Sequence, residues 1–108
     1  VIDAMRPNLL GATTQTSNPH LALEVRQWAA TTPAEGVVDA LEALRTRPDS
    51  RPTLPTITCP TLVLVGREDT LTPPEVAQVM RDGIADARYV EIVDAGHLAN
   101  LEQPDAFT

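Results

Sequence analysis

The sequence predicts an α/β fold in which two parallel strands are joined by a helix. Residues 61–66, TLVLVG, are a continuous apolar run rich in β-branched side chains, which is typical of a strand buried on both faces. Residues 87–96, ARYVEIVDAG, predict a second strand, and residues 72–83 between them have a helical pattern. Strand, helix and strand at this spacing make a βαβ unit. Such units are almost always right-handed, so we expect the two strands to be parallel neighbours.

The helix between the strands has clear start and stop signals. In TPPEVAQVMRDG, we expect Thr72 to cap the N-terminus, Pro73 to take the first helical position and Glu75 to complete a capping box. Gly83 is a natural C-terminal stop.

Residues 1–50 are predicted to be helical. Asn18 followed by Pro19, and Thr32 followed by Pro33, each indicate an N-cap and a first helical position. The next segment, RPDSRPTLPT, contains three prolines and is expected to be an extended connector. The apolar residues recur at near-helical spacing in both helices: Leu21, Leu23, Val25, Trp28 and Ala29 in the first, and Val37, Val38, Leu41 and Leu44 in the second.

Composition narrows the class of protein. The 108 residues suit one small domain, and 43% apolar residues are typical of a globular chain. Fifteen acidic and eight basic side chains give a formal charge of −7, which argues against a nucleic-acid partner. No apolar run approaches the roughly 20 residues that cross a bilayer, and no export leader is visible, so we expect a cytoplasmic protein. The single Cys59 excludes an intramolecular disulfide and is expected to be buried.

Two parallel strands make a poor independent sheet, because such sheets have several strands with both faces covered. Either the chain associates with a copy of itself, or further strands belong to an upstream segment. The chain begins at Val1 rather than Met and stops at Thr108 inside an apparent helix start, which favours the upstream segment.

Ionisable residues follow both predicted strands. Asp69 comes after the strand that ends at Gly66, and His97 comes after the second strand. Catalytic groups gather at the carboxyl ends of strands in open α/β sheets, and neighbouring strands lie about 5 Å apart, so this carboxylate can orient the imidazole. Glu68 and Asp94 compete for the acid role. Asp94 is too near His97 in sequence to come from a neighbouring strand.

CPTLVLVGREDTLTPPEVAQVM and ARYVEIVDAGHLANLEQPDAF together resemble the C-terminal part of an α/β-hydrolase. In that family the penultimate strand is followed by Gly-x-x-Asp, often with Thr-Pro soon after, and the last strand by Gly-His. The tail LANLEQPDAF resembles the small bacterial branch of enol-lactonases, esterases and cofactor-free haloperoxidase-like enzymes. The resemblance covers residues 52–108. The matching positions are Gly66, Asp69, Thr72, Pro73, Gly96 and His97.

The resemblance implies a C-terminal α/β-hydrolase fragment, with the last two parallel strands and their crossover helix preceded by cap-type helices. Residues 1–50 would be a cap-like helical segment, and residues 51–108 a core segment. Asp69 would be the triad acid and His97 the general base. The substrate would be a small ester or lactone, and no metal or organic cofactor is implied.

The chain departs from the family pattern in lacking a nucleophile. The serines are Ser17 and Ser50, and neither lies in the Gly-x-Ser-x-Gly elbow that presents the attacking group. Losing the nucleophile removes most of a triad's rate enhancement. We therefore expect the 108-residue chain to hydrolyse nothing by itself.

Other interpretations stay open. An upstream aspartate nucleophile would make the parent an epoxide hydrolase or dehalogenase, and a peroxide-forming serine site would make it a haloperoxidase. A non-catalytic, self-associating binding module is an alternative of another class. The lack of Gly-x-Gly-x-x-Gly argues against a dinucleotide-binding half domain. Trp28 is expected to pack, His20 to lie on the surface, and Leu98 either to pack or to touch substrate.

Overall fold

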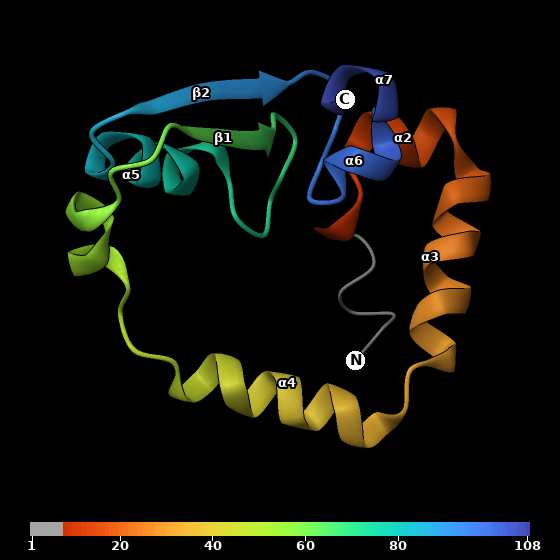
Figure 1. Ribbon diagram of the computed structural model, residues 1–108. Coiled ribbons are helices and arrows are strands. Elements are labelled where there is room, and N and C mark those ends of the chain that lie inside the picture. The colour runs from red at the N-terminus through yellow and green to blue at the C-terminus, as the bar shows by residue number, and fades with distance from the viewer. Residues whose placement is uncertain (1–7) are drawn as a thin grey trace.

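The computed structural model describes residues 8–108 (Figure 1). The two strands, the helix between them and the short 3₁₀ helix lie together, and the two long helices of residues 19–46 extend away from them. The helices are α2 (Ala12–Ser17), α3 (Pro19–Thr31), α4 (Ala34–Thr46), α5 (Pro74–Gly83), α6 (Ala99–Glu102) and α7 (Pro104–Phe107), with the 3₁₀ helix η1 (Arg51–Thr56) before the first strand.

The sheet has two parallel strands, β1 (Thr61–Gly66) and β2 (Ala87–Ile92). Their residues pair in step from Thr61 with Ala87 to Gly66 with Ile92, so both strands end at the same edge. The predicted βαβ unit is confirmed. The second strand is shorter than predicted, because Asp94 has a φ of 57° and turns the chain away from the sheet.

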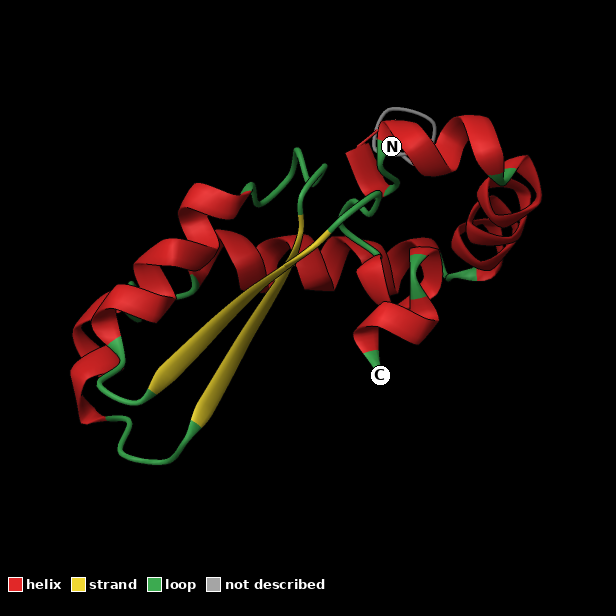
Figure 2. Ribbon diagram, turned by 90° about the horizontal axis from the view of Figure 1, so that it is seen from above, coloured by secondary structure: helices red, strands yellow, loops and turns green. Residues whose placement is uncertain are grey.

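Helix α5 connects the strands and packs against them (Figure 2). Its Ala77 is buried in one cluster with Val63 and Val65 of β1. The helix ends at Gly83 as predicted, but its N-terminus differs from the prediction. Pro73 is the N-cap, and no side-chain capping bond forms, because the Thr72 hydroxyl bonds elsewhere.

The first-half helices confirm one predicted cap and correct the other. Oδ1 of Asn18 accepts a hydrogen bond from the backbone N–H of Leu21 at 3.2 Å and caps α3. The hydroxyl of Thr32 instead donates to the carbonyl of Trp28 at 3.1 Å, so it closes α3 rather than opening α4. Helix α4 buries no residue, and the predicted apolar stripe is mostly exposed.

Two further expectations about local structure are wrong. In the proline-rich connector Arg47 is extended, but Ser50 has helical backbone angles and residues 51–56 form η1. A 3₁₀ turn tolerates Pro52 at its start because the first N–H groups of a helix have no intrahelical partner. Cys59 is exposed, since it lies in the turn before β1 rather than inside the strand.

The buried core is divided into small clusters. Leu10, Leu21 and Val25 form one, against which Leu98 packs, and Ile92, Ala95 and Ala99 form another. Several large apolar side chains remain exposed, among them Leu62 and Val90 of the strands. Among residues 8–108, no helix has the length and apolar character needed to cross a membrane.

Candidate active site

The loops that follow β1 and β2 are bonded to each other along their backbones. The N–H of Arg67 donates to the carbonyl of Ile92 at 2.9 Å, and the N–H of Glu68 donates to that of Ala95 at 2.8 Å. The loops approach closely at Gly66, where a Cβ atom would collide with the carbonyl oxygens of Ala95 and Gly96. A glycine at this position therefore lets the two strand ends converge.

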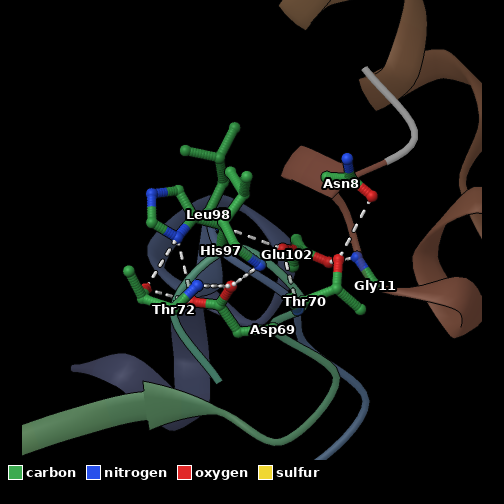
Figure 3. A network of polar contacts seen from close by, with 10 residues as sticks. Asn8, Gly11, Asp69, Thr70, Thr72, His97, Leu98 and Glu102 are labelled. Carbon is green, nitrogen blue, oxygen red and sulfur yellow. Dashed lines mark hydrogen bonds and ion pairs between the residues drawn. The ribbon is translucent and has the colours of Figure 1, made fainter. Parts of the chain in front are cut away.

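Asp69 and His97 meet where the loops converge (Figure 3). Nδ1 of His97 lies 2.9 Å from Oδ2 of Asp69, although the two residues are 28 positions apart. The Asp69 side chain is 5% exposed, whereas that of His97 is 34% exposed. The carboxylate is thus enclosed by protein, and the imidazole reaches the surface of the loops.

Asp69 is surrounded by hydrogen-bond donors. Its Oδ1 accepts the backbone N–H groups of Leu71 at 2.9 Å and Thr72 at 3.0 Å, and its Oδ2 accepts the Thr72 hydroxyl at 3.0 Å. Burial alone would raise the pKa of Asp69. The backbone N–H of Thr72, the His97 ring and the Thr72 hydroxyl outweigh burial and hold that pKa below its ordinary value.

The ionised carboxylate of Asp69 determines which ring nitrogen of His97 carries the hydrogen. A carboxylate can only accept hydrogen bonds, so Nδ1 of His97 carries the hydrogen that faces Asp69. In the neutral ring Nε2 is then the basic nitrogen. Nε2 has no hydrogen-bond partner within residues 8–108, and in Figure 3 it points away from Asp69. This tautomer leaves Nε2 able to accept a proton.

Thr72 is a site residue that the sequence analysis placed at a helix cap. Its Oγ1 lies 3.0 Å from Oδ2 of Asp69 and 3.2 Å from Nδ1 of His97. The hydroxyl therefore contacts both members of the pair. Its position three residues after Asp69 was the available signal. The signal was missed because the Thr-Pro pair also fits a helix start.

The competing acids do not contact His97. Both carboxylate oxygens of Glu68 bind Thr13, at 2.9 Å from its backbone N–H and 2.5 Å from its hydroxyl. Asp94 is exposed, and its carbonyl oxygen accepts a bond from the Gln103 side chain at 3.2 Å. Of the three carboxylates considered, the structure brings only Asp69 to the histidine.

The family model described as "Alpha/beta hydrolase family" matches residues 3–108. The chain belongs to the α/β-hydrolase family. The predicted resemblance and the predicted fold class are both confirmed.

Named relatives lie within the predicted branch of the α/β-hydrolases. The chain is 38% identical over 90 residues to 3-oxoadipate enol-lactonase 1 of Acinetobacter baylyi, covering 83% of this chain and 33% of that protein. A thermophilic esterase from Thermogutta terrifontis has a TM-score of 0.94 and 40% identity, covering 98% of this chain and 39% of the other. The enol-lactonase of Burkholderia xenovorans LB400 has a TM-score of 0.89 and 35% identity, covering 98% and 40%. The chain thus spans about a third to two fifths of the length of these α/β-hydrolases.

A hollow of about 420 Å³ adjoins the Asp69–His97 pair of this α/β-hydrolase. Apolar side chains of β1 and α5, such as Leu64 and Val76, line it together with Arg47. A larger hollow, of about 570 Å³, lies between η1 and α5 but touches neither Asp69 nor His97. Of these two hollows, the smaller one borders both Asp69 and His97.

Three other residues singled out in the sequence can also be placed. His20 is on the surface beside Glu24, 3.4 Å away, as predicted. Trp28 is 52% exposed, so the predicted packing is not observed. Leu98, which follows His97, packs against the cluster of Leu10, Leu21 and Val25, which is one of the two roles expected for it. Within the described residues, no cluster of histidine, cysteine and acidic side chains could hold a metal ion.

The sequence analysis also missed Glu102. This residue lies in α6 with little exposure, and its carboxylate binds backbone N–H groups of three residues, including both neighbours of His97. An acidic residue in the mostly apolar turn LANLE was the available signal.

Proposed function

We propose that this chain is the acid-and-histidine segment of a serine-dependent α/β-hydrolase that cleaves a carboxylic ester or lactone. The observation that carries the proposal is the 2.9 Å contact between Asp69 Oδ2 and His97 Nδ1, with Nε2 left unbonded. The relatives named as an enol-lactonase and an esterase support this substrate class.

In this mechanism His97 acts as a general base. Nε2 removes the hydroxyl proton of a serine as the serine attacks the substrate carbonyl, and later returns a proton to the leaving alcohol. Nε2 then activates a water that hydrolyses the acyl-enzyme. Asp69 holds the ring in the required tautomer and stabilises the imidazolium at each step.

The attacking serine would come from a part of the enzyme outside this chain. Neither Ser17 nor Ser50 lies in a Gly-x-Ser-x-Gly elbow, and neither lines the hollow beside His97. Residues 1–50 would serve as a cap-like segment, and residues 51–108 would be the core segment that carries the acid and the histidine. By itself the chain would hydrolyse no ester.

Labelling with a serine-reactive fluorophosphonate tests the nucleophile. The full-length enzyme that contains this chain should be labelled on one serine in a Gly-x-Ser-x-Gly sequence, and the 108-residue chain should not be labelled. If the full-length enzyme resists labelling, the serine mechanism is wrong. Mapping a covalent adduct to an aspartate would instead support epoxide hydrolase or dehalogenase chemistry.

Replacing each of the two histidines tests the general base. In the full-length enzyme, His97→Ala should lower kcat for a p-nitrophenyl ester by at least about a thousandfold, because the triad acts as a unit. His20→Ala is the matched control, since His20 lies on the surface with its side chain 81% exposed. Retained activity in His97→Ala, with the fold intact by circular dichroism, would rule out the assigned role.

A further inference from the structure

Glu102 is a buried carboxylate whose two oxygens bind backbone amides of three residues. Oε2 accepts the N–H of Gly11 at 2.8 Å, and Oε1 accepts the N–H groups of Gly96 at 2.9 Å and Leu98 at 3.1 Å (Figure 3). Glu102 is 9% exposed. This enclosure makes the side chain part of the framework of the loops rather than a surface group.

The bound amides lie on both sides of His97. Gly96 and Leu98 are its immediate neighbours, so Glu102 forms hydrogen bonds to the backbone just before and just after His97. The third amide belongs to Gly11, the N-cap of helix α2. The same carboxylate therefore links the histidine loop to the start of α2.

Little else could replace these bonds. Within residues 8–108, the N–H groups of Gly11 and Gly96 have no other acceptor, whereas that of Leu98 also reaches the carbonyl of Leu9 at 3.2 Å. The Gly96 backbone is packed against Gly11, where a Cβ atom at Gly96 would collide with the backbone of Gly11 and Leu10. Without Glu102, two buried donors would lose their partner, and the loop would have to move to satisfy them.

We infer that Glu102 is a positioning residue for His97. By holding Gly96 and Leu98, it keeps Nδ1 on Asp69 and directs Nε2 toward the reacting group. The inference rests on the proposed function, in which Nε2 transfers the proton. Within residues 8–108, Glu102 has no hydrogen bond to the His97 ring, and it does not line the hollow beside it.

Glu68 provides a matched comparison. Glu68 lies in the loop after β1, and like Glu102 it is an acidic residue whose carboxylate binds the start of α2, in its case at Thr13. However, its carboxylate contacts neither His97 nor a neighbour of His97. A purely structural link between the loops and α2 would make the two glutamates equivalent.

The test compares Glu102→Gln, Glu102→Ala and Glu68→Gln in the full-length enzyme, with rates normalised to the folded fraction. Glu102→Ala should lower kcat about 100-fold with KM nearly unchanged, because a small misplacement of a catalytic group has an effect of this size. Glu102→Gln keeps one oxygen for Gly96 and Leu98 and should recover part of the loss. Glu68→Gln should stay within about twofold of the wild type.

Proton NMR gives a readout that does not depend on turnover. The low-field Nδ1–H signal of His97 should weaken or shift in both Glu102 variants and persist in Glu68→Gln. If Glu102→Ala does not fold, Glu102→Gln decides. An unchanged kcat and an unchanged Nδ1–H signal, or equal losses in the Glu68 and Glu102 variants, would overturn the inference. If the wild type hydrolyses no ester, the proposed function fails, and the NMR comparison still decides whether Glu102 positions the ring.

Discussion

Nδ1 of His97 lies 2.9 Å from Oδ2 of Asp69, and this contact joins the ends of two neighbouring parallel strands. The acid is buried and the base is partly exposed, so the two groups occupy different environments. An enclosed carboxylate holds the ring, while the opposite nitrogen of the ring stays accessible. This division is what a general base with a fixed tautomer requires.

The first prediction concerns the charge on Asp69. In the full-length enzyme, Asp69→Asn should lower kcat for an ester by about 10³- to 10⁴-fold, because an amide can donate to Nδ1 and favours the wrong tautomer. The fold should persist, since the amide oxygen can still accept the N–H groups of Leu71 and Thr72. Steady-state kinetics with circular dichroism as the control test this. A loss below tenfold would contradict the role of Asp69.

The second prediction concerns the Thr72 hydroxyl. Thr72→Val removes the donor to Asp69 with little change in shape, and kcat/KM should fall about ten- to a hundredfold, as for loss of a hydrogen bond to a charged group. Thr72→Ser keeps the hydroxyl and should stay within about threefold. If the two variants have equal rates, the hydroxyl does not support the pair.

The third prediction is a pH dependence of stability. The pKa of Asp69 is lower in the folded chain than its ordinary value, so the unfolded state binds more protons in acid. The stability due to Asp69 is therefore fully present at neutral pH, declines below about pH 4, and is lost as the pH falls through the folded-state pKa. Urea unfolding of wild type and Asp69→Asn from pH 7 to 3 should show a difference that shrinks in acid. A difference that does not change with pH would contradict the prediction.

The fourth prediction concerns the exposed face of α4. Val38, Leu41 and Leu44 of this helix are 63%, 46% and 56% exposed, which is an apolar surface that a stable monomer rarely shows. We expect the isolated chain to self-associate at micromolar concentration, measured by sedimentation velocity. Leu41→Glu with Leu44→Glu should shift it toward monomer, whereas Asp39→Asn, about 200° round the helix from Leu41, should not. A monomeric wild-type chain would contradict this prediction.

The βαβ unit could be predicted from the sequence because its signals are local. The continuous apolar run TLVLVG does not fit the pattern of an amphipathic helix. Strand β1 begins and ends at the same residues as this run. The strand order then places Asp69 and His97 at one edge, whatever the details of their loops. Their juxtaposition could therefore be expected before any coordinates were known.

The errors arose where one residue had two possible partners. Thr72 fits a helix cap by its position before Pro73, but its hydroxyl bonds to the Asp69 carboxylate and does not cap α5. A hydrogen bond to an ionised group is stronger than one between neutral groups. Glu102 could not be assigned from sequence, because its partners are backbone amides, one of them 91 positions away. The apolar stripe of α4 was predicted, but its exposure was not, because an amphipathic pattern shows which face is apolar and not what covers it.

The last prediction contrasts two glycines. Gly66→Ala should destabilise the chain by about 1–3 kcal/mol or more, because the new methyl group would meet backbone carbonyl oxygens of Ala95 and Gly96, which cannot rotate away. Gly36→Ala should stabilise it by about 0.5–1 kcal/mol, because Gly36 lies in α4 and, apart from its chain neighbours and the nearby helix backbone, no described atom lies within 4 Å of the added methyl group. Urea unfolding measures both changes in free energy. Because Gly66 also sets the approach of the two loops, Gly66→Ala should weaken the contact between Asp69 and His97. A Gly66→Ala variant as stable as the wild type would show that the close approach at Gly66 does not limit the fold.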